Sequence, residues 1–171
     1  MPKILADLLM MPKAALLILA ACIGAFILVL ALQYGFGVQP CVLCIWQRVP
    51  VGTAAILALA AYVMHRGGKP VWWLLALCAV VFAVESGLAI FHTGVERHWW
   101  LGTSGCTIQH PLHGNNAEDL RQQLLNTVVA RCDEISWTFL GLSLANWNVP
   151  FSLALCAFSA LAARRTCKFR T

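Results

Sequence analysis

Two pairs of cysteines stand apart from the rest of the sequence by their spacing and surroundings. Cys41 and Cys44 form a CxxC pair in the segment PCVLCIWQR, and Cys106 and Cys132 lie together in a later, more polar segment. CxxC spacing is typical of a dithiol that opens and closes during redox chemistry. A disulfide across two residues removes little chain entropy, so stapling is a weak reason for this pair. The spacing therefore favours redox chemistry at Cys41 and Cys44.

The second pair also admits a purely structural interpretation. A disulfide between Cys106 and Cys132 would stabilise the fold by about 3 kcal/mol in the chain-entropy model. Metal binding is a further alternative, since His98, His110 and His113 lie in the same segment. Their spacing matches no standard zinc pattern, and cysteines in disulfides cannot bind a metal, so we expect no metal site.

Arg48 follows Cys44 by one helical turn, at the start of a long apolar run. A helix N-terminus favours a thiolate, whereas it is an unfavourable place for an arginine, as is the apolar layer of a membrane. Snorkelling of Arg48 to the lipid headgroups is the structural alternative. The functional interpretation is that Arg48 stabilises the Cys44 thiolate and holds a polar oxygen of a ligand.

The chemistry of the dithiol restricts what that ligand can be. Oxidation of two thiols to a disulfide releases two electrons and two protons. The sequence carries no flavin or nucleotide fingerprint, so the acceptor should be a diffusible, lipid-soluble molecule. A quinone accepts two electrons, resides in the bilayer and has carbonyl groups that Arg48 could hydrogen-bond.

The composition indicates the elements that must position these residues. Of the 171 residues, 60% are hydrophobic and only 11% are charged, which is too little charge to cover a soluble domain. Four apolar runs predict membrane-spanning helices over residues 14–32, 45–64, 71–91 and 147–163. We therefore predict an all-α membrane protein, a bundle of four transmembrane helices in a single integral domain over residues 1–171. A cleaved signal peptide is a weaker alternative for the first run, which is long and lacks a cleavage site.

The basic residues fix the predicted orientation. The formal net charge is +5, and most of the basic groups lie in short clusters on one side of the apolar runs: Lys3, Lys13, His65, Arg66, Lys69, Arg164, Arg165, Lys168 and Arg170. Such a distribution argues against nucleic-acid binding and follows the positive-inside rule, which places both termini in the cytoplasm. The opposite side then holds two loops, residues 33–44 and 92–146, and with them both cysteine pairs.

The second loop contains one helical pattern. Leu120, Leu124 and Val128 share one face of the stretch from Glu118, with polar residues opposite. This pattern predicts a short amphipathic helix, which would lie on the membrane surface or pack against the rest of the loop.

Five further residues within or beside the spans could carry function. Cys22, Cys78 and Cys156 lie inside apolar runs and Cys167 follows the last one, and buried cysteines commonly behave as small hydrophobic residues. We expect these four to be inert. Glu85 lies within the third run, where an acid is a functional candidate, either paired with Arg48 or neutral and protonated.

Taken with the four predicted spans, these motifs resemble the DsbB family of bacterial disulfide bond formation proteins. The likeness rests on PCVLCIWQR in the first loop, on the spacing of Cys106 and Cys132, and on CDEISWTFLGLSLANWN before the last span. His92, in FHTG at the end of the third run, matches a further family position. The likeness covers nearly the whole chain.

This resemblance implies a protein thiol:quinone oxidoreductase with a defined order of cysteines. Cys106 would be attacked by a reduced, DsbA-like thioredoxin-fold oxidase of the periplasm, giving a mixed disulfide. Cys132 would be released and could bridge transiently to Cys41. Cys44 would then be the thiolate that reacts with the quinone.

The resemblance also implies the setting of the reaction. The protein would lie in the bacterial inner membrane, with its active cysteines on the periplasmic side. Ubiquinone would be the acceptor, with menaquinone as an alternative under anaerobic conditions. Arg48 would stabilise the Cys44 thiolate and the reduced quinone, and His92 would line the quinone site.

Two other functional classes fit parts of the sequence. A non-enzymatic four-span protein that scaffolds a partner would keep both disulfides as permanent structural bridges. A different quinone-linked thiol oxidoreductase is the other alternative, either a DsbB paralogue or a relative of vitamin K epoxide reductase. The vitamin K epoxide reductase alternative is disfavoured because the CxxC pair lies on span two, before the other cysteine pair.

Overall fold

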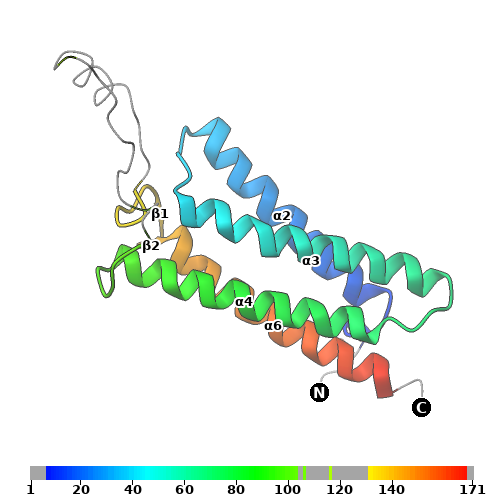
Figure 1. Cartoon of the computed structure of the whole chain (residues 1–171). Helices are drawn as coiled ribbons and strands as arrows, with labels where there is room; N and C mark the ends of the chain where they lie inside the picture. Colours follow the sequence, from blue (N-terminus) through cyan, green and yellow to red (C-terminus); the bar gives the residue numbers. More distant parts are fainter. Residues whose placement is uncertain (1–6, 104–105, 107–115, 117–130, 169–171) are drawn as a thin grey trace.

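Four long helices form a bundle in the computed structural model, which describes residues 7–103, 106, 116 and 131–168. The helices are α2 (Lys13–Gly35), α3 (Val42–Arg66), α4 (Trp72–Glu96) and α6 (Leu144–Lys168) (Figure 1). Each is long and apolar enough to cross a membrane. The predicted all-α, four-span fold class is confirmed. The amphipathic helix predicted from Glu118 to Val128 lies outside the described residues.

The helices extend beyond the apolar runs that predicted them. Helix α3 begins at Val42 rather than near residue 45, and α4 ends at Glu96 rather than near residue 91. An apolar run marks only the part of a helix suited to hydrocarbon, whereas backbone hydrogen bonding continues into the polar ends. Cys44, expected at the N-terminus of span two, and His92, expected at the outer end of span three, therefore both lie inside helices.

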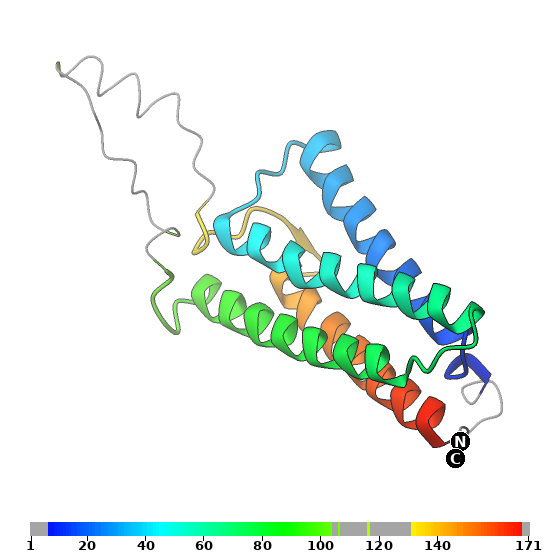
Figure 2. The same ribbon diagram turned by 45° about the vertical axis from the view of Figure 1, so that its right-hand side comes forward.

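The packing of the bundle is uneven. Helix α4 makes its most extensive contacts with α6, then with α3, whereas α2 packs on α3 and barely contacts α6. Figures 1 and 2 both show the C-terminal part of α2 leaning away from α4 and α6. Space is therefore left between α2 and α6 at the end of the bundle where α3 begins and α4 ends. We call this end the cysteine end.

Small residues allow the close packing of α3. Ala54, Ala58 and Ala61 are fully buried and repeat at the spacing of one helix face. Small side chains let helix backbones approach one another, which is how helices associate where lipid removes the hydrophobic driving force. Between α4 and α6, Ser86 Oγ donates a hydrogen bond of 3.0 Å to Ser152 Oγ. The buried alanines and the hydrogen bond between the two serines together hold α3, α4 and α6 in close contact.

A short hairpin precedes α6 at the cysteine end. Strands β1 (Thr138–Phe139) and β2 (Leu142–Ser143) pair antiparallel, with Thr138 opposite Ser143. The two turn residues, Leu140 and Gly141, both have positive φ, 53° and 77°, as a type I′ hairpin turn requires. Trp147 Nε1 donates a 3.0 Å hydrogen bond to the carbonyl of Phe139, which holds the hairpin against the first turn of α6.

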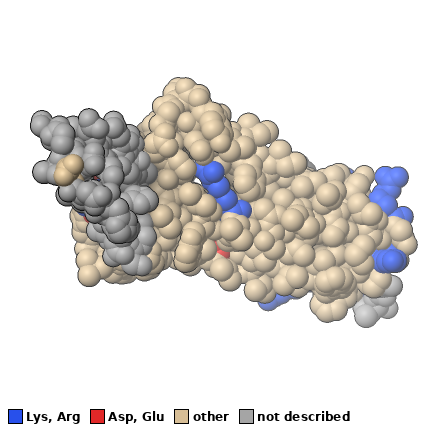
Figure 3. Space-filling model, turned by 45° about the horizontal axis from the view of Figure 1, so that its top comes forward, with Lys and Arg blue, Asp and Glu red and all other residues tan. Residues whose placement is uncertain are grey.

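The surface of the bundle suits a lipid environment. Large apolar side chains are exposed along every long helix, among them Ile27 at 63%, Ile56 at 71% and Val80 at 59%. Figure 3 shows a broad uncharged surface along the helices, with Lys and Arg gathered mainly at the end opposite the cysteine end. Of the four cysteines expected to be inert, Cys22 and Cys78 lie in the hydrophobic core and Cys156 is half-buried, whereas Cys167 is exposed.

The end of α4 depends on one glycine. Trp100 folds back onto α4, stacks on Phe91 and donates a 2.9 Å hydrogen bond from Nε1 to the Phe91 carbonyl. A Cβ atom on Gly94 would lie 2.0 Å from the Trp100 ring, which no side chain tolerates. Gly94 is therefore required for the chain reversal that leads from α4 towards Cys106.

We predict that Gly94→Ala lowers the stability of the protein in detergent by about 1–3 kcal/mol, because the Trp100 ring must leave its position. Gly87→Ala, on the same helix, is the matched control, since a Cβ atom there meets nothing within 4 Å. Thermal unfolding of the two variants beside the unmodified protein measures the difference. Equal midpoints for both variants would contradict this account of Gly94.

Candidate functional site

The structure brings the four predicted redox cysteines together at the cysteine end. Cys41, Cys106 and Cys132 belong to one buried cluster with Leu43 and Val95, and Cys44 packs against it. Cys132 is fully buried, and Cys41 and Cys106 are only 5% and 4% exposed. All four are free thiols in this structure. Residues far apart in the sequence thus place both pairs within one small volume, as thiol exchange between pairs requires.

The N-terminus of α3 positions three of these sulfurs. Cys41 is the N-cap residue, and its Sγ accepts a hydrogen bond of 3.3 Å from the backbone N–H of Cys44. The Cys41 and Cys44 sulfurs are 2.8 Å apart. Cys132 approaches the same turn, where its sulfur accepts a hydrogen bond from the backbone N–H of Leu43. The unpaired N–H groups and the positive end of the helix dipole favour negative charge on sulfur here.

Cys41, which precedes α3, and Cys132, in the second loop, both have a raised pKa. The hydrogen bond to Cys44, together with burial, raises the pKa of Cys41 to about 12. Burial also raises the pKa of Cys132 above its ordinary value, with a further contribution from its hydrogen bond to Cys106. At neutral pH Cys41 is therefore a thiol, and it donates the hydrogen bond to the Cys44 sulfur.

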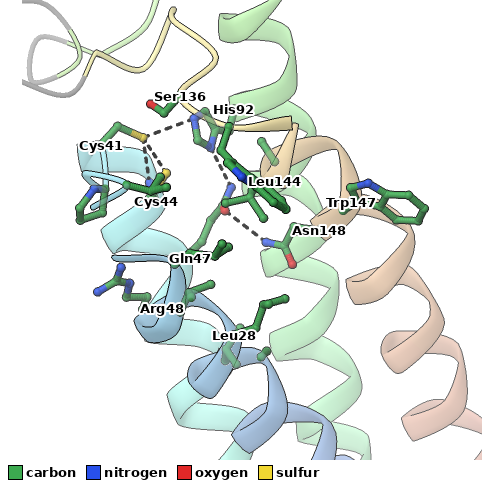
Figure 4. A pocket seen from close by; sticks show the side chains of 18 of the residues that line it. Leu28, Cys41, Cys44, Gln47, Arg48, His92, Ser136, Leu144, Trp147 and Asn148 are labelled. Carbon is green, nitrogen blue, oxygen red and sulfur yellow. Dashed lines mark hydrogen bonds between the residues drawn. The ribbon is translucent and has the colours of Figure 1, made fainter. Parts of the chain in front are cut away.

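A chain of side-chain hydrogen bonds leads from Cys41 into the bundle (Figure 4). Cys41 Sγ lies 3.4 Å from His92 Nε2, and His92 Nδ1 lies 3.3 Å from Gln47 Nε2. Gln47 Oε1 in turn accepts a 3.2 Å hydrogen bond from Asn148 Nδ2. Because Asn148 engages the oxygen of Gln47, the Gln47 nitrogen donates to Nδ1, and the proton of neutral His92 lies on Nε2, facing Cys41.

A carboxylate approaches the same ring nitrogen of His92 that faces Cys41. Glu96 follows His92 by one turn of α4, and its Oε1 is 3.8 Å from His92 Nε2. Ser143 of β2 donates a hydrogen bond to the same carboxylate. His92, only 2% exposed, thus lies between a thiol and an acid, where its ring could carry a proton between them.

A cavity of about 710 Å³ opens beside the CxxC pair, between α2, α3, α4 and α6. Its wall is largely apolar, with contributions from Phe26, Leu28 and Val29 of α2. The polar groups on its wall include the predicted site residues Cys41, Cys44, Arg48 and His92, together with Gln47, Glu85 and Asn148. The space left by the uneven packing of α2 is therefore an apolar pocket with a thiol at one end.

Two charged groups of the cavity have different partners from those considered in the sequence. Arg48 reaches towards α2, where it donates a 2.8 Å hydrogen bond to Gln33 Oε1. Glu85 is fully buried and accepts a hydrogen bond from Asn148 Nδ2. In the described part of the chain Glu85 therefore pairs with an amide, and the ion pair with Arg48 is not formed.

Three of these residues could also bind a soft metal ion. The ligand atoms of Cys41, Cys44 and His92 all lie within 4.8 Å of one another. Two sulfurs on one tetrahedral Zn²⁺ would be about 3.8 Å apart, given bonds of about 2.3 Å. The observed 2.8 Å is well short of that, so the dithiol would have to open to accept zinc. Of the histidines considered as ligands, His98 is exposed, and His110 and His113 lie outside the described residues.

Sequence reasoning missed Gln47, Asn148 and Glu96. Two of them had a local signal in the sequence. Gln47 follows Cys44 by three residues in the segment PCVLCIWQR, and Glu96 follows His92 by four residues, or about one helical turn. Asn148 had none, because its contact with Gln47 joins helices far apart in the sequence.

These features define a multi-pass membrane protein with a dithiol at the end of a helical bundle. The family model "Disulfide bond formation protein DsbB" matches residues 12–162. The chain belongs to the DsbB family. Membership makes it a disulfide bond formation protein, with the disulfide oxidoreductase role of that family.

Individual relatives agree with the family match. The disulfide bond formation protein B of Acinetobacter baylyi is 34% identical over 154 residues, which cover 83% of this chain and 84% of the relative. The protein of that name from Xanthomonas campestris pv. campestris is 30% identical over 149 residues, covering 83% and 84%. That from Methylococcus capsulatus is 31% identical over 153 residues, covering 82% and 86%. No solved structure matches the chain.

We predict that limited alkylation of the reduced protein at pH 7.5 modifies Cys44 before Cys41. Cys41 is more deeply buried, and with a pKa of about 12 only a very small fraction of it is thiolate at this pH. The rate at Cys41 should rise about tenfold for each pH unit from 7 to 9, as the thiolate fraction does. Peptide mass spectrometry separates the two sites.

The Cys41→Ala variant is the control for the contact between the two thiols. It removes the hydrogen bond donor of Cys44, so alkylation of Cys44 should become slower at the same pH. Faster alkylation of Cys41 than of Cys44 in the unmodified protein would show that the proton is shared differently.

Proposed function

We propose that this protein is a thiol:quinone oxidoreductase that reoxidises a DsbA-like partner and passes the electrons to a membrane quinone. One observation carries the proposal: the CxxC thiol Cys44 opens into an apolar cavity within the bundle that also holds Arg48 and His92. A permanent structural disulfide would have no use for such a pocket. The proposal deepens the family assignment by naming the electron acceptor.

The cavity fits a quinone in shape and chemistry. Binding sites for molecules of this size are mostly apolar pockets of about 300–1,000 Å³ with a few well-placed polar groups, and the cavity has about 710 Å³. The sparse contact between α2 and α6 suits access from the lipid. When bound, a quinone would supply an acceptor for two electrons and two protons. Cys44, Arg48 and His92 are the groups proposed to hold it.

The proposed relay uses the four cysteines in a fixed order. Cys106 receives the attack of the reduced partner and forms a mixed disulfide, which releases Cys132 as a thiolate. Cys132 then exchanges with Cys41, with which it shares the N-terminal turn of α3. Cys44 is thereby freed as the thiolate that faces the cavity. Each exchange breaks one disulfide and forms another, so electrons move from the partner to Cys44.

The side chains around the dithiol support the last step. Cys44 delivers the electrons, and closure of the Cys41–Cys44 disulfide completes their transfer. Departure of the oxidised partner frees Cys106, which bonds Cys132 again and releases Cys41 as a thiol. As the Cys41–Cys44 disulfide closes, Cys41 gives its proton to His92 Nε2 at 3.4 Å, the nearest base once His92 has released its own proton to Glu96. Arg48 stabilises the Cys44 thiolate and a quinone oxygen, a task for which its hydrogen bond to Gln33 orients the guanidinium.

We further propose the setting implied by the family. Residues 1–171 form one integral domain of the bacterial inner membrane, with both termini in the cytoplasm. The cysteine end faces the periplasm, where the thioredoxin-fold partner is reoxidised. Ubiquinone is the acceptor, and menaquinone replaces it under anaerobic conditions. The charge distribution along the sequence supports this orientation.

The direct test mixes the purified protein in detergent with a reduced DsbA-like partner and ubiquinone, with EDTA present so that metal binding at Cys41, Cys44 and His92 cannot interfere. Loss of the quinone absorbance over many turnovers, absent in Cys44→Ala, would establish the relay. A Cys41–Cys44 disulfide that persists whatever the quinone supply would instead support the scaffold function.

We predict that Arg48→Ala slows quinone reduction about ten- to a hundredfold, the effect of losing a hydrogen bond to a charged group. The attack of the partner on Cys106 should change far less, because Arg48 lies in the cavity and not in the cysteine cluster. Stopped-flow measurement of the two half-reactions separates these effects. Arg48→Lys keeps the charge but loses the planar guanidinium. Its rate of quinone reduction should lie between the rates of the unmodified protein and of Arg48→Ala. Equal slowing of both half-reactions would contradict the assigned role.

A further inference from the structure

Glu85 is the one acid within a span whose chemistry the relay above does not use. It lies on α4, about two turns from His92 towards the middle of the bundle, and its side chain is fully buried. Oε1 accepts a hydrogen bond from Asn148 Nδ2, whereas Oε2 has no hydrogen-bond partner among the described residues. The residue lies on the wall of the cavity that holds Cys44 and Arg48. An unpartnered carboxyl oxygen is therefore available to a molecule in that cavity.

A structural role alone does not explain an acid at this position. A glutamine would accept the same hydrogen bond from Asn148 without placing an ionisable group in the membrane, where such groups are expensive and usually functional. No Lys, Arg or His nitrogen lies within ion-pairing distance of Glu85 in the described part of the chain. A buried carboxyl without a cation is more stable neutral than charged, and a neutral carboxyl group carries a proton that it can donate.

The position of Glu85 suits proton delivery at a point in the cavity deeper than the thiols. Asn148 Nδ2 bonds both Gln47 Oε1 and Glu85 Oε1, so the carboxyl lies at the level of Gln47 on α3, deeper than the CxxC pair. In Figure 4 Gln47 and Asn148 lie deeper than the thiols and His92, and Glu85, which bonds Asn148, lines the same cavity. A ring with an oxygen at each end would thus meet a different proton donor at each.

We propose that Glu85 is a proton donor to the quinone oxygen that lies deeper in the cavity. The inference rests on the proposed function and adds a catalytic residue to it. The assignment follows from the unpartnered Oε2, the complete burial of the side chain and its place on the cavity wall.

The protons and electrons balance. In the net reaction the partner's dithiol loses two electrons and two protons as its sulfurs bond, the electrons pass through Cys41 and Cys44, and the quinone gains two electrons and two protons to become a quinol. Glu85 gives one proton to the deeper oxygen, and the His92 side of the cavity supplies the other to the opposite oxygen. Glu85 then regains, through water in the cavity, one of the two protons that the dithiol released. No further oxidant or reductant is needed.

Glu85→Gln tests this assignment, because it keeps the hydrogen bond acceptor for Asn148 and removes the acidic proton. We expect quinone reduction to slow about a hundredfold or more, the usual contribution of a general acid. The thiol exchange between the partner and Cys106 should keep its rate. Glu85→Asp retains a proton donor and should recover part of the loss, which Glu85→Ala should not.

Ser86→Ala is the matched control. Ser86 neighbours Glu85 and makes a buried contact between α4 and α6 with Ser152, but it does not line the cavity. A structural effect of Glu85→Gln would appear in both variants and in their unfolding temperatures. The proposal expects Ser86→Ala to reduce quinone at nearly the unmodified rate.

A second measurement does not depend on turnover. The infrared difference spectrum between the oxidised and reduced protein with bound ubiquinone should contain a neutral-carboxyl C=O band that Glu85→Gln removes. Unchanged quinone reduction and an unchanged carboxyl band in Glu85→Gln would overturn the proton-donor role while leaving the proposed function intact. Absence of quinone reduction in the unmodified protein and in Ser86→Ala would overturn both.

Discussion

Three helices of the site meet at the amide of Gln47. Its nitrogen bonds His92 of α4, and its oxygen accepts from Asn148 of α6, while Gln47 itself is in the first turns of α3. Polar groups buried in a membrane protein must find partners within the protein, and a network is rigid only when each member is satisfied. The nitrogen and the oxygen of the Gln47 amide each make a hydrogen bond, one to His92 and one to Asn148. The position of the CxxC pair relative to His92 depends on this interaction.

The bundle separates stability from function along its length. The larger hydrophobic core, which includes Ile18, Leu75 and Phe82, lies towards the end opposite the cysteines and holds α2 against the other helices. At the cysteine end α2 leans away, and the space it leaves becomes the cavity. A void lowers stability because its lining loses packing contacts. The close packing of α3, α4 and α6 around small residues offsets that loss without filling the cavity.

The sequence was sufficient for the fold class, and it singled out the four cysteines that the structure brings together. Hydropathy predicted the four spans because the length of an apolar run is set by the membrane, and CxxC spacing singled out Cys41 and Cys44. The helix ends could not be predicted as well from the sequence, since α3 and α4 continue past their apolar runs into polar residues. Cys44 and His92 were expected at the ends of spans two and three, and both lie inside the longer helices.

The partners of the charged groups lay beyond sequence reasoning. Arg48 bonds Gln33 and Glu85 bonds Asn148, and both pairings follow from how α2 and α6 are placed around α3 and α4. No periodicity or spacing encodes such a contact between helices. The considered pairing of Glu85 with Arg48 failed on this point. Both residues do line one cavity, as their positions within the apolar layer suggested.

The N-terminal turn of α3 also gives the proposed relay a direction. Its backbone N–H groups donate hydrogen bonds to two sulfurs. The N–H of Cys44 bonds the Cys41 sulfur, and the N–H of Leu43 bonds the Cys132 sulfur. Negative charge on either sulfur is therefore stabilised by the same helix end. When an attack on Cys106 releases Cys132, the new charge forms beside Cys41, the sulfur it must attack next. Exchange then moves the charge to Cys44, on the side of the turn that faces the cavity, so that one helix end carries it from the cluster to the acceptor site.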